Sequence, residues 1–167
     1  GYDHKYVYSH FGYNLKVTDM QAAIGCAQLQ KLPGFVEARR RNFAYLSERL
    51  QCEREYFILP KPCENSDPSW FGFMITCRES VDKNKVVRYL EENGIQTRML
   101  FAGNLTKQPC FDEMRKTGAG YRIVGELTNT DHIMENTFWI GVYPGMTTEM
   151  LNYMVEKITE TVSMPCD

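Results

Sequence analysis

The sequence has few features that would mark a membrane, secreted or nucleic-acid-binding protein. No apolar run approaches the roughly 20 residues of a membrane-spanning helix, and the first residues lack the basic and then apolar pattern of a signal peptide. With 19 basic and 21 acidic residues, the net charge is only -2. Charge therefore gives no reason to expect nucleic acid or an anionic membrane as a partner, and we expect a cytoplasmic protein.

Cysteine and histidine are too scattered for a typical metal site. None of the six cysteines forms a CxC or CxxC pair with another, and the three histidines are remote from all of them in sequence. In a chain without a secretory signal, such cysteines are commonly small buried hydrophobes rather than disulfide staples. We therefore expect no metal, and cysteines that are unpaired and buried.

Common catalytic motifs are also missing. The chain has no GxGxxG, GxxxxGK[ST], GxSxG or HExxH pattern. His10 and His132 could each act as a base, but nothing in the sequence orients either ring, and a lone histidine is more often a surface or packing residue. Taken alone, the chain does not have the features of a complete catalyst.

What the sequence does contain is the pattern of one compact α+β domain. A length of 167 residues suits a single domain, 1–167. Thr18 and Gln21 have capping-box spacing, so a helix should begin at about Asp19. Apolar residues then follow the helical period to Leu50, interrupted by Pro33-Gly34. The pattern predicts a long N-terminal helix that is bent or broken near Pro33.

Strands and further helices alternate along the rest of the chain. Glu53 to Pro68 is predicted to be a connecting loop, and the aromatic and β-branched run Trp70–Cys77 a strand buried on both faces. The other predicted elements are strands over 95–101 and 138–142, a helix capped by Ser80 or Asp82 that runs through Leu90, a helix over 109–116, a helix start at 129–131, and a last helix capped by Thr147 or Thr148. This order suggests a sheet with helices on one face.

Two polar turns are candidate ligand contacts. Asn14 lies in a glycine-containing turn ahead of a helix, where its amide N–H could reach a phosphate. Arg98 lies at the end of a predicted strand, where it could pair with an anion. The alternative is that Asn14 only satisfies a turn and Arg98 only solvates a strand end, and spacing alone leaves both interpretations open.

Three segments resemble, in order, the C-terminal domain of the DegT/DnrJ/EryC1/StrS family of sugar aminotransferases and dehydratases. They are GYNLKVTDMQAAIGCAQLQKLPGFVEARRRNF, GIQTRMLFAGNLTKQPCF and NTFWIGVYPGMTTEMLNYMVEKI. The resemblance implies the small domain of a fold type I pyridoxal-phosphate enzyme, with three or four mainly antiparallel strands and helices packed on one face. SHFGYNLKVTDMQAAIG and LFAGNLTKQP are most similar to the nucleotide-sugar 3-dehydratase branch, whose CDP-sugar members act on CDP-4-keto-6-deoxyglucose in lipopolysaccharide synthesis.

The resemblance also implies that this chain is a fragment without catalytic residues of its own. The family's large domain, which binds pyridoxamine or pyridoxal phosphate, is not matched, and neither are the cysteines that hold a [2Fe-2S] cluster in the CDP-sugar branch. The implied partners are the chain's own N-terminal domain, a second subunit in a homodimer, a reductase and a nucleotide-sugar substrate.

Site residues follow from the resemblance position by position. Asn14 matches the asparagine that binds the partner subunit's cofactor phosphate, and Tyr6 an aromatic residue near that cofactor. Lys16 stands where aminotransferases commonly have an arginine that clamps the carboxylate of the amino donor; lysine offers only a point charge, which favours a dehydratase without a glutamate half-reaction. Arg98, Phe101 and Asn104 match the sugar-nucleotide loop. The alternatives are a sugar aminotransferase of the same family and a stand-alone binding or scaffold domain.

Overall fold

The computed structural model describes residues 10, 12–13 and 15–163. The chain divides into two compact units, Gly1–Pro33 and Gly34–Asp167. The first unit contains the beginning of helix α1, and the second contains the rest of α1 and all other elements. The second unit is α+β, with helices packed against one antiparallel sheet.

Helix α1 spans Asp19–Arg49 and begins as the sequence predicts. The Gln21 backbone N–H donates to Thr18 Oγ1 at 3.3 Å, and the Thr18 N–H donates to Gln21 Oε1 at 3.0 Å, which completes a capping box. The predicted break near Pro33 is wrong, because α1 is one continuous helix with Pro33 inside it. Proline removes one backbone donor, and the hydrogen bonds of the turns on either side are enough to continue the helix. The boundary between the two units nevertheless falls after this residue.

The sheet has four antiparallel strands in the order β1-β2-β4-β3. They are β1 (Phe57–Ile58), β2 (Gly72–Cys77), β3 (Thr97–Met99) and β4 (Thr137–Gly141). In the centre of the sheet, Phe73 lies opposite Ile140, and on the other side of β4 Thr97 also lies opposite Ile140. The mainly antiparallel prediction is confirmed, but β1 lies within a stretch predicted to be only a loop.

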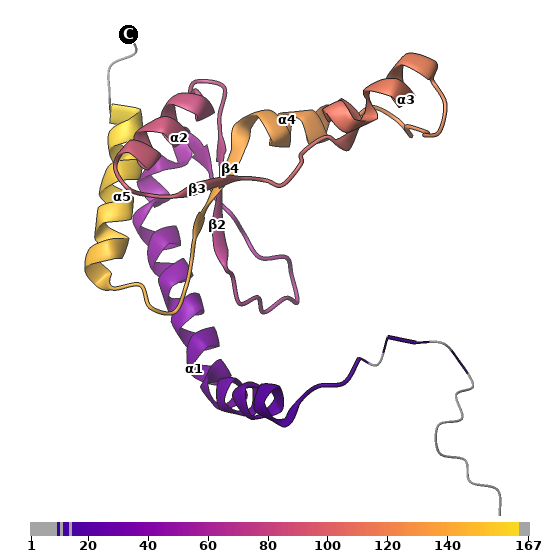
Figure 1. Ribbon diagram of the computed structural model, residues 1–167. Helices are drawn as coiled ribbons and strands as arrows, with labels where there is room; N and C mark the ends of the chain where they lie inside the picture. The colour runs from indigo at the N-terminus through magenta and orange to yellow at the C-terminus, as the bar shows by residue number, and fades with distance from the viewer. Residues whose placement is uncertain (1–9, 11, 14, 164–167) are drawn as a thin grey trace, which may run out of the picture. The chain divides into compact units, whose positions relative to one another are not determined.

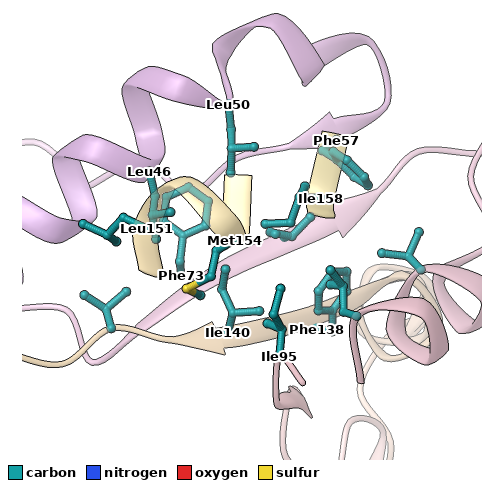
Figure 2. Close-up of a cluster of buried hydrophobic side chains, with 14 of the residues drawn as sticks. Leu46, Leu50, Phe57, Phe73, Ile95, Phe138, Ile140, Leu151, Met154 and Ile158 are labelled. Atoms are coloured by element: carbon teal, nitrogen blue, oxygen red, sulfur yellow. The ribbon is translucent and has the colours of Figure 1, made fainter. Parts of the chain in front are cut away.

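Helices cover one face of this sheet. The second half of α1 lies there with α2 (Lys83–Glu92) and α5 (Thr148–Ser163), as Figure 1 shows. Figure 2 shows side chains from α1 and α5 pointing toward the strands, and the labelled residues that are fully buried are Leu46, Leu50, Phe57, Phe73, Phe138, Ile140 and Ile158. Each such side chain contributes roughly 1.5–3 kcal/mol by leaving water. Burial of these side chains between the helices and the sheet is therefore a main source of the fold's stability.

The ends of α2 and α5 follow their sequence signals. Asp82 accepts hydrogen bonds from the backbone of Asn84 and Lys85, which fixes the start of α2. Gly94 has a φ of 74°, and the Ile95 N–H closes back onto the Leu90 carbonyl at 2.9 Å, so α2 ends with the predicted glycine turn. At the start of α5, the Met150 N–H donates to Thr147 Oγ1.

An arm connects β3 to β4. It contains the 3₁₀ turns η2 (Leu105–Lys107) and η3 (Pro109–Phe111) and the helices α3 (Asp112–Thr117) and α4 (Thr128–Asn136). Figure 1 shows the arm in orange, running away from the sheet and returning through α4 into β4. A further 3₁₀ turn, η1 (Gln51–Glu55), links α1 to β1.

Two expectations about burial need correction. Strand β2 is not buried on both faces, since Met74 and Thr76 on the side away from the helices are only half-buried. Of the five cysteines that the structure describes, only Cys77 is buried, whereas Cys26, Cys52, Cys63 and Cys110 are exposed free thiols. Small size favours burial of a thiol but does not require it, and these four lie on exposed stretches of helix, turn and loop.

Candidate functional site

Arg98 and two aromatic rings form a short row at the sheet face away from the core helices. Side chains alternate between the faces of a strand, so Trp139 points away from the core that its neighbours Phe138 and Ile140 enter. Arg98 lies directly across from it on β3, with its guanidinium carbon 6.0 Å from the centre of the indole ring. This distance is that of a cation–π contact.

Gly72 and Phe71 fix the indole of Trp139 from the other side. A Cβ placed on Gly72 would lie 2.6 Å from Trp139 Cε3, so only glycine lets the ring lie flat over β2. The Phe71 ring meets the indole edge-on, at a centroid distance of 5.4 Å and an angle of 87°. In the described part of the chain, Arg98 makes no ion pair with a carboxylate. The row therefore presents an oriented cation that is available to an anionic ligand.

A groove of about 380 Å³ lies beside Arg98 at the β3 edge of the sheet. Its lining is mainly apolar and comes from β3, β4, α5, the turn between α2 and β3, and the turn between β4 and α5: Gly94, Ile95, Gln96, Arg98, Trp139, Gly141, Tyr143, Met146, Met150, Tyr153 and Met154. At the edge strand β3, the Thr97 N–H and hydroxyl both donate to Glu91 Oε1, at 3.2 and 2.6 Å, so this N–H is not open to pairing with another chain. These two hydrogen bonds hold the pKa of Glu91 below its usual range.

The loop after β3 places Phe101 and Asn104 in opposite environments. Phe101 has a φ of 50° and a side chain that is 81% exposed. Asn104 is buried, where its Oδ1 accepts from the Thr106 N–H and hydroxyl and its Nδ2 donates to Asp131 Oδ1 at 2.7 Å. Hydrogen bonding from Asn104 and Lys107 holds the pKa of Asp131 below its usual range.

The residues predicted from the sequence are thus partly brought together. Arg98 and Phe101 both lie exposed at and just after β3, while the side chain of Asn104 is engaged within the fold. Lys16 is exposed ahead of α1 in the other unit, and Asn14 and Tyr6 lie outside the described residues.

Sequence reasoning missed the residues that support this region. Trp139 stands in a predicted strand, and its alternation with buried neighbours was the available signal for a side chain on the opposite face. Asp131 gave no local signal, because its partners Asn104 and Lys107 are more than 20 residues away in sequence.

Two hollows among the described residues lack the groups of a pyridoxal-phosphate site. Such a site needs an amine or imidazole beside the cofactor and a carboxylate for its pyridine nitrogen. The groove at the β3 edge is lined by neither, and a second hollow of about 250 Å³ in the arm has only Arg115 as a charged residue. Nor does any group of three or more His, Cys, Asp or Glu in the described ranges have the arrangement of a metal site. Among the same residues, no helix has the length and apolar character needed to cross a bilayer.

Comparisons with known proteins agree with the fold. The lipopolysaccharide biosynthesis protein RfbH of Salmonella typhimurium is 58% identical over 96% of this chain and 36% of its own length. The dTDP-4-dehydro-2,6-dideoxy-D-glucose 3-dehydratase of Saccharopolyspora spinosa is 48% identical over 98% of this chain and 34% of its own length. A solved structure of Escherichia coli GDP-4-keto-6-deoxy-D-mannose-3-dehydratase with bound hydrated pyridoxal phosphate superposes with a TM-score of 0.72, at 26% identity over 88% of this chain and 36% of the other.

Two facts follow from these comparisons. The chain spans about a third of the length of the relatives it matches. The model of the DegT/DnrJ/EryC1/StrS aminotransferase family matches residues 1–159, nearly the whole sequence. The predicted α+β fold, that of the smaller part of a pyridoxal-phosphate aminotransferase-fold enzyme, is confirmed, and the chain belongs to the DegT/DnrJ/EryC1/StrS aminotransferase family.

Proposed function

We propose that this chain is the small C-terminal domain of a nucleotide-sugar 3-dehydratase that removes the 3-hydroxyl of a 4-keto-6-deoxy sugar. The observation that carries the proposal is 48% identity to a sugar 3-dehydratase over 98% of this chain. The 58% identity to a lipopolysaccharide biosynthesis protein favours a CDP-4-keto-6-deoxyglucose substrate for a 3,6-dideoxyhexose. The protein would act in the cytoplasm.

In this proposal, the pyridoxamine or pyridoxal phosphate is held mainly by a large domain outside this chain. That cofactor would supply the electron sink for loss of the 3-hydroxyl. Asn14 and Tyr6 would contact the cofactor of a partner subunit. Arg98, Phe101 and Lys16 would contact the substrate, and Asn104, whose side chain is bonded within the fold, would shape the substrate loop. An iron–sulfur cluster and a reductase belong to the proposal for the CDP-sugar case, with the cluster ligands outside this chain.

The first half of α1 supports a covering partner. Met20 and Ile24 are 78% and 64% exposed, and Leu29 points out on another side of the helix at 68%. Large apolar side chains exposed on more than one side of a helix are normally covered by a partner. We therefore assign this segment to contacts with the protein's own large domain and with the second subunit of a homodimer.

The decisive experiment uses the complete gene product with CDP-4-keto-6-deoxyglucose, a supplied reductase and electron donor, and mass spectrometry of the product. A dehydratase yields a sugar with one oxygen fewer, and added glutamate does not change the outcome. A glutamate-dependent amino sugar would establish the aminotransferase alternative instead. No reaction with CDP-, dTDP- or GDP-linked 4-keto sugars, and no cofactor absorbance, would contradict the proposal and support a binding or scaffold domain.

A further inference from the structure

Phe101 combines two unfavourable features that the fold does not offset. Its φ of 50° is in the left-handed region, where a bulky side chain is strained, and its ring is 81% exposed. Asn65 is the other non-glycine residue with a positive φ among the described residues, and asparagine tolerates that conformation well. A strained and exposed aromatic residue is typical of a site where structure is maintained for binding.

The surrounding loop is held from several directions. Gly103, with a φ of 61°, lies so close to α4 that a Cβ on it would be 2.3 Å from Met134 Cγ. The next residue, Asn104, donates its backbone N–H to Met134 Sδ at 3.3 Å. The Ala102 carbonyl, directly after Phe101, accepts from Gln108 Nε2 at 2.7 Å. Toward the N-terminal side, the Phe101 N–H donates to the Met99 carbonyl at 2.8 Å. The main chain around Phe101 is therefore fixed.

Asp131 is the central anchor of this loop. One of its carboxylate oxygens accepts from Asn104 Nδ2 at 2.7 Å, and the other pairs with Lys107 Nζ at 2.9 Å. Asn104 is only 2% exposed, so loss of its acceptor would leave a buried amide donor unsatisfied. Asp131 thus joins the first turn of α4 to both ends of the segment 104–107 that follows Phe101.

We infer that Asp131 is a positioning residue, which acts through Asn104 to hold the ring of Phe101 ready to pack on a ring face of the nucleotide sugar. This inference rests on the proposed function and adds a second residue to it. The ring face belongs either to the base, which stacks on an aromatic side chain, or to the hexose, whose C–H groups pack against one. Phe101 touches the ligand, and Asp131 does not.

The test measures binding of CDP-glucose and of CDP to the complete gene product by calorimetry, separately from turnover, since CDP-glucose lacks the 4-keto group. Phe101→Gly should weaken CDP-glucose binding about tenfold, within the range for loss of one stacking contact. It should not lower the unfolding midpoint, because glycine relieves the strained φ. Equal weakening for CDP would assign the stacked ring to the base, and weakening for CDP-glucose alone would assign it to the hexose.

The role of Asp131 is tested by a double-mutant cycle. Asp131→Ala should weaken binding in the wild-type background and have almost no further effect in the Phe101→Gly background, because both changes remove the same contact. Asp131→Asn keeps an acceptor for Asn104 and should restore most of the affinity. Glu113→Ala, which removes an exposed ion pair with Lys116 elsewhere in the arm, is the matched control and should leave binding unchanged.

Two results would overturn the inference. One is full affinity in Phe101→Gly, and the other is an Asp131→Ala effect that is equally large with and without the phenylalanine ring, which is what a general structural role predicts. A wild-type protein that binds none of CDP-glucose, dTDP-glucose and GDP-mannose would instead contradict the proposed function itself, and the inference with it.

Discussion

Replacing Gly103 with alanine should destabilise the protein far more than the same change at Gly118. Both glycines have a left-handed φ, 61° and 66°. At Gly118 nothing lies within 4 Å of an added Cβ, whereas at Gly103 it would lie 2.3 Å from Met134 Cγ and 2.8 Å from Met134 Cβ. These atoms are near the backbone of α4, so they cannot simply swing away.

The magnitude follows from two contributions. Left-handed strain costs about 1–2 kcal/mol for a non-glycine residue, and the smaller entropy of the unfolded alanine chain offsets roughly 0.4–1 kcal/mol of it. The net loss at Gly118 is therefore about 1 kcal/mol. Overpacking against Met134 adds about 2 kcal/mol at Gly103, for a total of about 3 kcal/mol.

Urea unfolding curves of the purified variants measure these free energies. The double variant Gly103→Ala with Met134→Ala should be about 2 kcal/mol more stable than the sum of the two single changes predicts, because the shorter side chain removes the overpacking. The close packing of the loop on α4 would be refuted if Gly103→Ala and Gly118→Ala lowered the free energy of unfolding equally. It would also be refuted if the effects of Gly103→Ala and Met134→Ala were strictly additive.

Two further predictions concern titrating groups. The pKa of Asp131 is held below its usual range by Asn104 and then Lys107, so the stability it contributes is present above the unfolded pKa of about 4 and is lost as the pH falls through the folded pKa. Asp131→Asn should therefore flatten the acid side of a stability-versus-pH profile measured by thermal unfolding, and an unchanged profile would contradict the contact. Burial raises the pKa of the Cys77 thiol to about 12, and only the thiolate reacts with iodoacetamide. At pH 8, exposed Cys110 should therefore be alkylated at least about tenfold faster than Cys77, as peptide mass spectrometry would show. Early labelling of Cys77 would argue against its burial.

Local signals in the sequence predicted those features that depend on neighbouring residues. The capping box of Thr18 and Gln21 and the glycine turn at Gly94 each involve residues within a few positions, so the pattern itself contains the interaction. The two residues of β1 could not be predicted, because so short a strand forms only where β2 offers it a partner. Pro33 does not break α1, since a single lost donor does not outweigh the helix on both sides.

The candidate site was predicted less completely, for a physical reason. Phe101 and Arg98 could be named from the family resemblance, but the sequence does not show that Asn104 is buried. The burial of Asn104 depends on its contact with Asp131, which is 27 positions later in the sequence. Long-range contacts of this kind are set by the packing of α4 and not by any local pattern.

The carboxylate of Glu91, which binds Thr97 at the edge of β3, also affects whether another chain can pair with that edge. A strand at the end of a sheet is a template on which another chain can add a strand, and an occupied donor blocks that addition. Here the block is a single ionised side chain at the end of α2 and not a proline or a bulge. Protonation of this carboxylate in acid weakens its hold on the Thr97 N–H, so the edge of β3 is best protected where Glu91 is ionised.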